Sequence, residues 1–224
     1  MKKFSVVGVL WLLLFICNLI AQENIEFTPD PHRFDNAISL FKSWDEKNSF
    51  AENAVLFVGS SSIRMWKTHK YFPELKVINR GFGGSHISDI IYFFNDVVKK
   101  YNPAKIVFYA GDNDIAAGKS PERVFSDFKH FVKMVRDSIG EVNLIYIPIK
   151  PSISRWKYWK EMKKTNMMIK KFIDNNENLF YADIVEPMLN ENRIPKEDIF
   201  INDGLHLNLK GYEIWTSILN KYLR

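Results

Sequence analysis

Residues 55–64 read Val55-Leu56-Phe57-Val58-Gly59-Ser60-Ser61-Ser62-Ile63-Arg64. An apolar run ends on a glycine, and small polar residues then open a turn with a helical pattern behind it. A buried strand that breaks into a tight turn holds its next side chains at the carboxyl edge of a sheet, where ligands bind in open α/β folds. The stretch therefore predicts an α/β fold with the hydroxyl of Ser61 at the binding edge.

Apolar runs alternate with helical patterns along the rest of the chain. The runs cover residues 54–58, 75–78, 105–110, 142–147 and 179–182, and the helical patterns cover 34–44, 87–99, 121–138, 156–173 and 212–222. Strands that alternate with helices predict a parallel sheet with helices on both faces. Continuous apolar strands fit burial on both sides. With right-handed crossovers, we predict a flavodoxin-like three-layer α/β/α sandwich of about five parallel strands.

The first 21 residues differ in kind from the rest. Two lysines precede an apolar run over residues 4–16, and a short polar stretch leads to Ala21. This layout is typical of a secretory signal peptide. We therefore predict cleavage after Ala21, a single domain over residues 22–224, and export to the periplasm or the outside. The apolar run is shorter than the about 20 residues of a membrane span, but an uncleaved membrane anchor stays an alternative.

Cys17 is the only cysteine of the chain and lies in this segment. A lipoprotein would be cleaved before Cys17 and carry lipid there, an alternative that the large Ile16 disfavours. If cleavage follows Ala21, the mature domain has no disulfide. The formal net charge of +5, which falls to +3 without Lys2 and Lys3, is too mild to indicate nucleic acid, so we predict no nucleic-acid partner.

An acid and a histidine stand far downstream, in Asp203-Gly204-Leu205-His206. A serine hydroxyl is a weak nucleophile that needs an adjacent base. His206 can take the proton of Ser61 and return it to a leaving alcohol. Asp203 can hold the imidazole tautomer and stabilise the imidazolium ion. Two loops between them, residues 79–84 and 111–114, can supply hydrogen-bond donors to an oxyanion. Together these groups predict a serine esterase.

These four stretches, in this order, resemble the blocks of the SGNH hydrolase superfamily, also called GDSL esterases and lipases. The resemblance runs from about Val55 to His206 and implies the same three-layer fold. It implies that Ser61 is the nucleophile, that His206 and Asp203 are its base and orienter, and that the oxyanion donors are Gly84 and Asn113. One position departs from the pattern, because the family often has aspartate where this chain has Ser60. That aspartate is not a triad member, so we expect activity to survive.

Each stretch alone allows another interpretation. Residues 59–62 suit a helix-capping turn, and the glycines of residues 81–84 could cradle a phosphate, although they do not spell GxGxxG. Asp112 and Asp114 could bind a divalent cation, and Asp203 could belong to a plain turn. No histidine and cysteine cluster indicates a transition metal. The joint occurrence of the four stretches favours a hydrolase, for which we predict no metal and no cofactor.

The sequence also argues against an α/β-hydrolase. That fold requires a G-x-S-x-G elbow, but Ile63 stands where the second glycine would be. The acid of this chain also lies three residues from its base, whereas in an α/β-hydrolase it follows a separate strand.

Residues 149–156 follow the fourth apolar run and should reach the same edge as Ser61. Lys150, Arg155 and Trp156 are predicted substrate contacts, and Trp159 is a further candidate that fits equally a core face of the next helix. Rings beside charged donors suit a sugar ester, and also a lysophospholipid. No long insertion is available for a lid, which favours short acyl groups. The alternatives are a lysophospholipase or thioesterase, and a non-catalytic module that binds carbohydrate or an envelope component.

Overall fold

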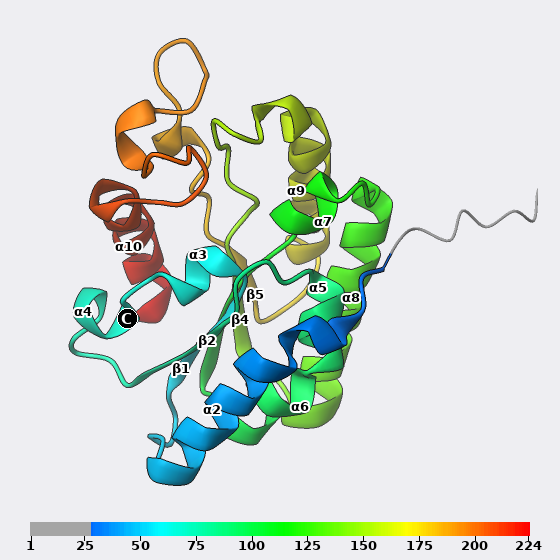
Figure 1. Cartoon of the computed structure of the whole chain (residues 1–224), viewed down its shortest axis with the longest axis vertical. Helices are drawn as coiled ribbons and strands as arrows, with labels where there is room; N and C mark the ends of the chain where they lie inside the picture. The colour runs from blue at the N-terminus through cyan, green and yellow to red at the C-terminus, as the bar shows by residue number, and fades with distance from the viewer. Residues whose placement is uncertain (1–27) are drawn as a thin grey trace, which may run out of the picture.

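The computed structural model describes residues 28–224, in which one parallel sheet lies between two layers of helices (Figure 1). The strand order is β2-β1-β3-β4-β5, and every pair is parallel. The predicted three-layer sandwich of five strands is thereby confirmed. The predicted signal peptide and Cys17 lie outside the described residues. Within residues 28–224, no helix has the length and apolarity needed to cross a bilayer.

The strands occur close to the apolar runs that predicted them. They are β1 (Val55–Gly59), β2 (Val77–Gly81), β3 (Lys105–Tyr109), β4 (Asn143–Tyr146) and β5 (Leu179–Tyr181). The second strand was predicted at residues 75–78 but extends through Asn79, Arg80 and Gly81. Asn79 fits a strand here because its Nδ2 donates to the carbonyl oxygens of Ile63 and Trp66. Contacts with residues distant in sequence therefore stabilise this end of β2, which the apolar pattern of the sequence does not mark.

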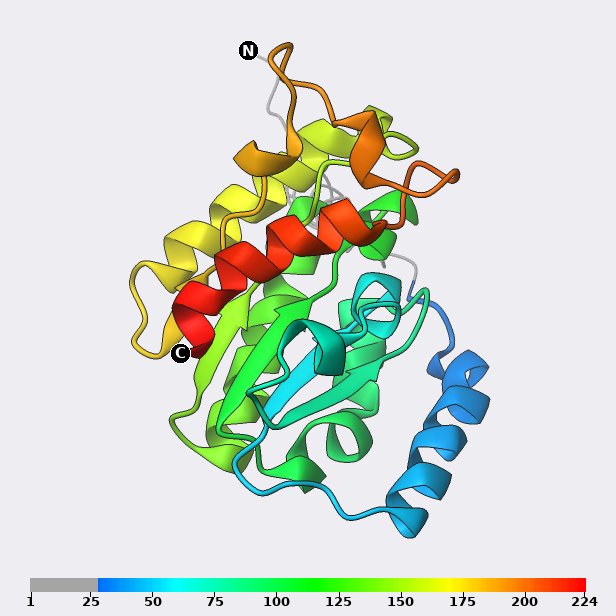
Figure 2. The same ribbon diagram turned by 90° about the vertical axis from the view of Figure 1, so that its left-hand side faces the viewer.

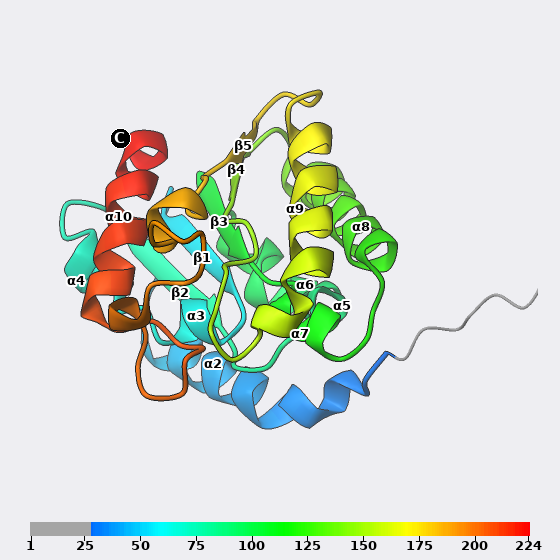
Figure 3. The ribbon, with the colours of Figure 1, turned by 90° about the horizontal axis from the view of Figure 1, so that it is seen from above.

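The helices divide between the two faces of the sheet (Figures 1 and 3). One face carries α2 (Asp35–Lys47), α5 (Ile87–Tyr92), α6 (Phe94–Val97), α8 (Pro121–Ile139) and α9 (Trp159–Ile173). The other carries α3 (Ser61–Arg64), α4 (Thr68–Tyr71) and α10 (Leu209–Leu223). The short α7 (Asp112–Ala116) follows β3, and single 3₁₀ turns are η1 (Pro31–Phe34), η2 (Lys99–Tyr101), η3 (Trp156–Tyr158), η4 (Glu186–Met188) and η5 (Glu197–Ile199).

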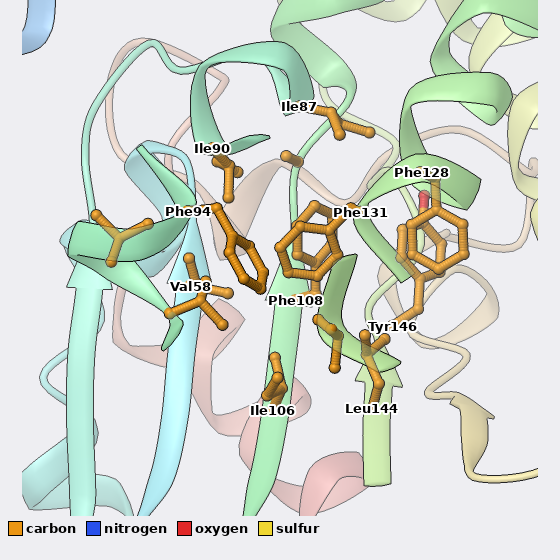
Figure 4. Packing of buried hydrophobic residues seen from close by; sticks show 14 of the residues in the cluster. Val58, Ile87, Ile90, Phe94, Ile106, Phe108, Phe128, Phe131, Leu144 and Tyr146 are labelled. Atoms are coloured by element: carbon orange, nitrogen blue, oxygen red, sulfur yellow. The ribbon is translucent and has the colours of Figure 1, made fainter. Parts of the chain in front are cut away.

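Two apolar cores fill the space between the sheet and its helices, because successive strand residues point to opposite faces. On the first face Phe108 of β3 packs on Phe131 of α8 with ring centroids 4.4 Å apart (Figure 4). On the second face Trp66 stacks on Tyr212 at 5.4 Å and meets Trp215 of α10 edge-on. Burial on both sides explains why the central strands read as continuous apolar runs.

The prediction of one continuous helix over residues 87–99 is wrong. The segment forms α5, α6 and η2, with a break at Phe93. Residues 92–98 read Tyr-Phe-Phe-Asn-Asp-Val-Val, seven successive residues of modest helix propensity, so tertiary packing decides the backbone. Phe93 packs edge-on against Phe82 with ring centroids 6.4 Å apart. By contrast α8 begins as expected, with Ser120 as its cap and Pro121 in the first turn.

Gly59 is a position where the fold requires glycine. Its φ is +151°, and an added Cβ would lie 1.9 Å from the backbone oxygen of Tyr109. Gly118 also has a positive φ, +91°, but an added Cβ there would meet nothing within 4 Å. We predict that Gly118→Ala costs about 1–2 kcal/mol of unfolding free energy through backbone strain alone. Gly59→Ala should cost more than about 4 kcal/mol, since β3 must move. Urea denaturation measures both, and equal losses would contradict the steric argument.

Candidate active site

The loops that follow β1, β2 and β3 meet at one edge of the sheet. β1 lies between the other two strands, with Gly59 opposite Gly81 on one side and Tyr109 on the other. The chain therefore leaves β1 toward β2 and returns to the far side of β1 as β3, which makes this a topological switch point. The segment before α10 reaches the same side of the sheet as α3 (Figure 2). Four stretches distant in sequence thus converge here.

Ser61, His206 and Asp203 form a continuous hydrogen-bonded chain. Ser61 is the first residue of α3, and its Oγ lies 2.9 Å from Nε2 of His206. Nδ1 of His206 lies 2.5 Å from Oδ2 of Asp203. With the imidazole proton on Nδ1, that nitrogen donates to Asp203, and Nε2 is left to accept the proton of the serine hydroxyl. The structure therefore brings the three predicted residues together in the predicted order.

A tight turn, not a helix, holds Asp203 and His206 on the same side. The backbone N–H groups of Leu205 and His206 donate to Oδ1 of Asp203 at 2.8 and 2.9 Å. Gly204 between them takes a left-handed φ of +62°. Burial alone would raise the pKa of Asp203, but the hydrogen bonds from His206 and Leu205 outweigh it and lower the pKa from 3.8 to about 2. The carboxylate is consequently ionised at neutral pH.

Asn113 connects the loops that follow β2 and β3. Its Nδ2 donates to the backbone oxygen of Ser85 at 3.0 Å, and its Oδ1 accepts a hydrogen bond of 2.8 Å from Arg155. Gly84, which precedes Ser85, has a φ of +85° and open space where a Cβ would point. The backbone N–H of Phe82 donates to the oxygen of Gly59, which ties the same loop to the end of β1. The predicted oxyanion donors thus lie on loops that are bonded together.

Ser60 takes the position where the family often has aspartate, and it is fully buried. Its Oγ has no hydrogen-bond partner among residues 28–224. Backbone groups hold the turn, since the N–H of Ser60 donates to the oxygen of Tyr109 and its own oxygen accepts from Ile63. The hydroxyl of Tyr212 donates to the backbone oxygen of Ser62 at 2.9 Å. The nucleophile turn is therefore held without a carboxylate.

The prediction that Lys150 contacts substrate is wrong. The residue is only 1% exposed, and its ammonium group lies beneath α3. Its Nζ donates to Oγ of Ser62 at 3.2 Å, to the hydroxyl of Tyr109 at 3.0 Å, and to Oδ2 of Asp112 at 3.4 Å. A buried ammonium ion needs such partners, and the only carboxylate among them is directly next to Asn113 in sequence. Burial lowers the pKa of Lys150, and Asp112 opposes that shift.

Arg155 and Trp156 lie at the edge of the sheet, but they face different surroundings. The guanidinium of Arg155 turns inward, with NH1 3.1 Å from Oδ2 of Asp112 and NH2 on Asn113. Trp156 is half-buried and stacks on Trp159, with ring centroids 5.7 Å apart and planes 14° from parallel. The two rings line a cavity of about 360 Å³ between α9 and residues 181–193.

Asp112 and Asp114 do not form the cation site that the sequence left open. Burial would raise the pKa of Asp112, but Lys150 and Arg155 lower it below its ordinary value. Asp114 instead accepts from Nζ of Lys119 at 2.7 Å and from the backbone N–H of Ile87. Asp112 is thus paired with Lys150 and Arg155, and Asp114 with Lys119. Across the described part of the chain, no three histidine, cysteine or acidic side chains converge as metal ligands would.

The Asp114–Lys119 pair is a feature that sequence reasoning missed. Burial raises the pKa of Asp114 to about 6, although Lys119 opposes the shift. Nδ1 of the buried His86 lies 3.6 Å from this carboxylate, and burial lowers the pKa of His86 to about 4. Asp114 belongs to α7 and accepts from the N–H of Ile87, so it connects α7 to the loop that contains Gly84. A lysine five residues after an aspartate carries no recognisable signal, so only the fold reveals the pair.

A comparison of the sequence with models of protein families shows which family the chain belongs to. Residues 63–214 match the model of the GDSL-like lipase/acylhydrolase family, which is more than half of the chain. The chain belongs to this family. The matched segment contains Gly84, Asn113, Asp203 and His206 but begins two residues after Ser61. The position of Ser61 in the site therefore rests on its contact with His206. No curated protein matches the sequence.

Solved structures with the same fold include other members of this family. A protein from Streptococcus pneumoniae described as a platelet activating factor superposes with a TM-score of 0.77 at 15% identity, covering 99% of this chain and 100% of that one. A GDSL-like lipase from Bacteroides thetaiotaomicron gives 0.71 at 19% identity, covering 83% and 96%. A mutant of Axe2, an acetylxylan esterase from Geobacillus stearothermophilus, gives 0.63 at 12% identity, covering 79% and 97%. At identities this low, the superpositions establish a shared fold and nothing more.

Lys150→Met tests how much the buried ammonium group contributes to the free energy of unfolding. Removing one partner of a buried ion pair typically costs about 3–5 kcal/mol, and Arg155 remains as a second partner of Asp112, so we predict a loss near about 3 kcal/mol. The matched control is Lys160→Met on the exposed face of α9, which should change the unfolding free energy by less than about 0.5 kcal/mol. Denaturant unfolding at pH 7 measures both. Equal effects would show that Lys150 is not a required partner.

Proposed function

We propose that the protein is a serine ester hydrolase in which Ser61, His206 and Asp203 form the catalytic triad. The observation that carries the proposal is the 2.9 Å contact between Oγ of Ser61 and Nε2 of His206, with Asp203 on the opposite ring nitrogen. His206 removes the hydroxyl proton as Oγ attacks the ester carbonyl carbon. It then gives that proton to the leaving alcohol, and an acyl-enzyme remains. Water, activated by the same histidine, releases the acid.

The negative charge that develops on the carbonyl oxygen needs donors already in place. We assign this role to the backbone N–H groups of Ser61 and Gly84 and to the side-chain amide of Asn113. Among the described residues, Nδ2 of Asn113 donates one hydrogen bond, to Ser85, so its second N–H group is left for a substrate oxygen. The bonds between the loops that carry Gly84 and Asn113 support a preorganised arrangement.

For the substrate we propose an ester of a short acyl group with a carbohydrate. The faces of sugar rings pack on aromatic side chains, and a few placed polar groups fix their orientation. The cavity beside Trp156 and Trp159 offers both, because Asp183, Glu186 and Arg193 also line it. Trp156 directly follows Arg155, which contacts Asn113, so the cavity begins next to the proposed oxyanion site. The fold shared with an acetylxylan esterase supports this choice by analogy alone.

A second candidate is hydrolysis of a longer acyl ester, as in a lysophospholipase or thioesterase. It is favoured by an apolar groove of about 480 Å³ between α2 and the segment that follows β1. The groove reaches Arg64 of the nucleophile helix and Gly83, the neighbour of Gly84. Its walls are mainly apolar and aromatic, with Phe34, Leu40, Trp44, Trp66 and Phe82 among them. An acyl chain bound there would begin close to the ester carbon.

Export is part of the proposal and rests on residues 1–21 alone. Their lysine pair, apolar run and small residue before the expected cleavage point have the layout of a signal peptide. An exported esterase would meet esters of the cell envelope or of external polymers.

We predict that Ser61→Ala and His206→Ala each lower kcat for p-nitrophenyl acetate by about 10⁴-fold or more, and that the double variant is scarcely worse. Nucleophile and base act as one unit, so their losses do not add. Asp203→Asn should be severe but less complete, because the base survives in the wrong tautomer. Ser126→Ala and His130→Ala, both on the exposed face of α8, are the matched controls and should keep wild-type rates. A folded Ser61→Ala protein with substantial turnover would overturn the proposed triad, whereas a folded wild-type protein without turnover would favour a non-catalytic binding module.

Substitution of two tryptophans, Trp156 and Trp44, distinguishes the two substrate candidates. Trp156→Ala should raise KM for acetylated xylo-oligosaccharides about tenfold, the order expected for one lost stacking contact of ~1.4 kcal/mol, and leave p-nitrophenyl acetate unaffected. Trp44→Ala, in the apolar groove, is the matched control and should change neither. Rates across an acyl series should fall from acetate to laurate. Faster turnover of the laurate ester, reduced by Trp44→Ala, would favour the second candidate instead.

A further inference from the structure

Arg155 forms a bridge between two side chains of the loop that follows β3. Its NH1 pairs with Oδ2 of Asp112 at 3.1 Å, and its NH2 donates to Oδ1 of Asn113 at 2.8 Å. The Arg155 side chain is 18% exposed, and Asp112 is almost fully buried at 4%. Nζ of Lys150 donates to the same oxygen of Asp112 at 3.4 Å. The guanidinium group is thereby held in place by a carboxylate that cannot move toward solvent.

The two hydrogen bonds on Asn113 admit only one orientation of its amide group. Arg155 can only donate, so the atom that faces it must be the amide oxygen. The backbone oxygen of Ser85 can only accept, so the atom that faces it must be the amide nitrogen. Rotating the amide by 180° would set donor against donor and acceptor against acceptor. Arg155 and Ser85 together therefore hold the amide with its N–H groups on the side of the Gly84 loop.

The same contact also polarises the amide. A charged donor on the carbonyl oxygen draws electron density from the nitrogen, and linked hydrogen bonds strengthen one another in a low-dielectric site. The remaining N–H of Asn113 becomes a better donor for a developing oxyanion. The arrangement is preorganised, because Asp112, which is also paired with Lys150, holds Arg155 before any substrate arrives.

We propose that Arg155 is a positioning residue that acts through Asn113, in place of the substrate contact that the sequence predicts. The inference rests on the proposed function, since it assigns Arg155 to the oxyanion site of that reaction. A group that orients a transition-state donor affects kcat, because the donor contributes little to ground-state binding. A group that touches substrate directly affects KM first. The two roles therefore separate in steady-state kinetics.

The test is a double-mutant cycle on Arg155 and Asn113 with p-nitrophenyl acetate. Asn113→Ala should lower kcat by about 10²–10³-fold, the usual loss for one oxyanion donor. We expect Arg155→Met to lower kcat by a similar factor with KM changed less than about twofold, and the double variant to be no worse than Asn113→Ala alone. Arg155→Lys keeps the charge beside Asp112 but lacks the fork that reaches both partners, so its rate should lie between.

A second readout and a control separate positioning from loss of folding. A phenylboronic acid that adds to Ser61 mimics the tetrahedral intermediate, and its inhibition constant should weaken in Arg155→Met in parallel with kcat. Arg123→Met removes a comparable arginine, which pairs with Asp127 on α8, and should leave kcat unchanged. If Arg155→Met does not fold, Arg155→Lys and its boronate affinity carry the test.

The outcomes distinguish this inference from the proposed function beneath it. Turnover that persists in Ser61→Ala would remove the proposed function and the inference with it. An inactive Ser61→Ala combined with a raised KM and an unchanged kcat in Arg155→Met would overturn the inference alone and restore Arg155 as a substrate contact. Additive losses in the double variant would also overturn it, since Arg155 would then act independently of Asn113.

Discussion

The pairing of β1 with β3 at the centre of the parallel sheet is the interaction on which the rest of the site depends. Parallel strands end at a common edge, so Ser61 after β1 and Asp112 and Asn113 after β3 leave the sheet side by side. Close approach is required, because Gly59 lies against the backbone oxygen of Tyr109 and has no room for a Cβ. The N–H of Ser60 then donates to that same oxygen, which aims the chain into α3.

Buried ion pairs connect the segments that meet at this edge. Asp112 lies between Lys150 and Arg155, and Asp114 is paired with Lys119, so two successive acidic positions of α7 connect to different parts of the molecule. Desolvation of such groups is costly, and buried ion pairs add little net stability over apolar packing. Their value here is geometric. Lys150 links Asp112 to Ser62 beneath the nucleophile helix, and Asp114 links α7 to the loop that carries Gly84.

Two cavities are lined by residues next in sequence to groups of the proposed oxyanion site, Trp156 beside Arg155 and Gly83 beside Gly84. One lies beyond Arg155 against α9 and is lined by stacked tryptophans and charged side chains, and the other lies beyond Gly83 against α2 and is mostly apolar. An ester has two unlike halves, an acyl group and an alcohol, and a serine hydrolase must hold both around one carbonyl carbon. Under the proposed function, the polar aromatic side suits a carbohydrate alcohol. The apolar side sets how long an acyl chain the protein accepts.

The sequence by itself determined the layer architecture, the approximate positions of all five strands, and the stretches that carry Ser61, Asn113, Asp203 and His206. These follow from local patterns, namely apolar runs, glycines at strand ends, and an acid three residues before a histidine. Only the tertiary structure decided which partners the long charged side chains contact and where some elements begin and end. Lys150 points beneath α3, Arg155 points toward Asn113, β2 continues through polar residues, and residues 87–99 break into short helices. The physical reason is that each outcome depends on partners distant in sequence, such as Asp112 for Lys150 and Ile63 for Asn79, which no local periodicity encodes.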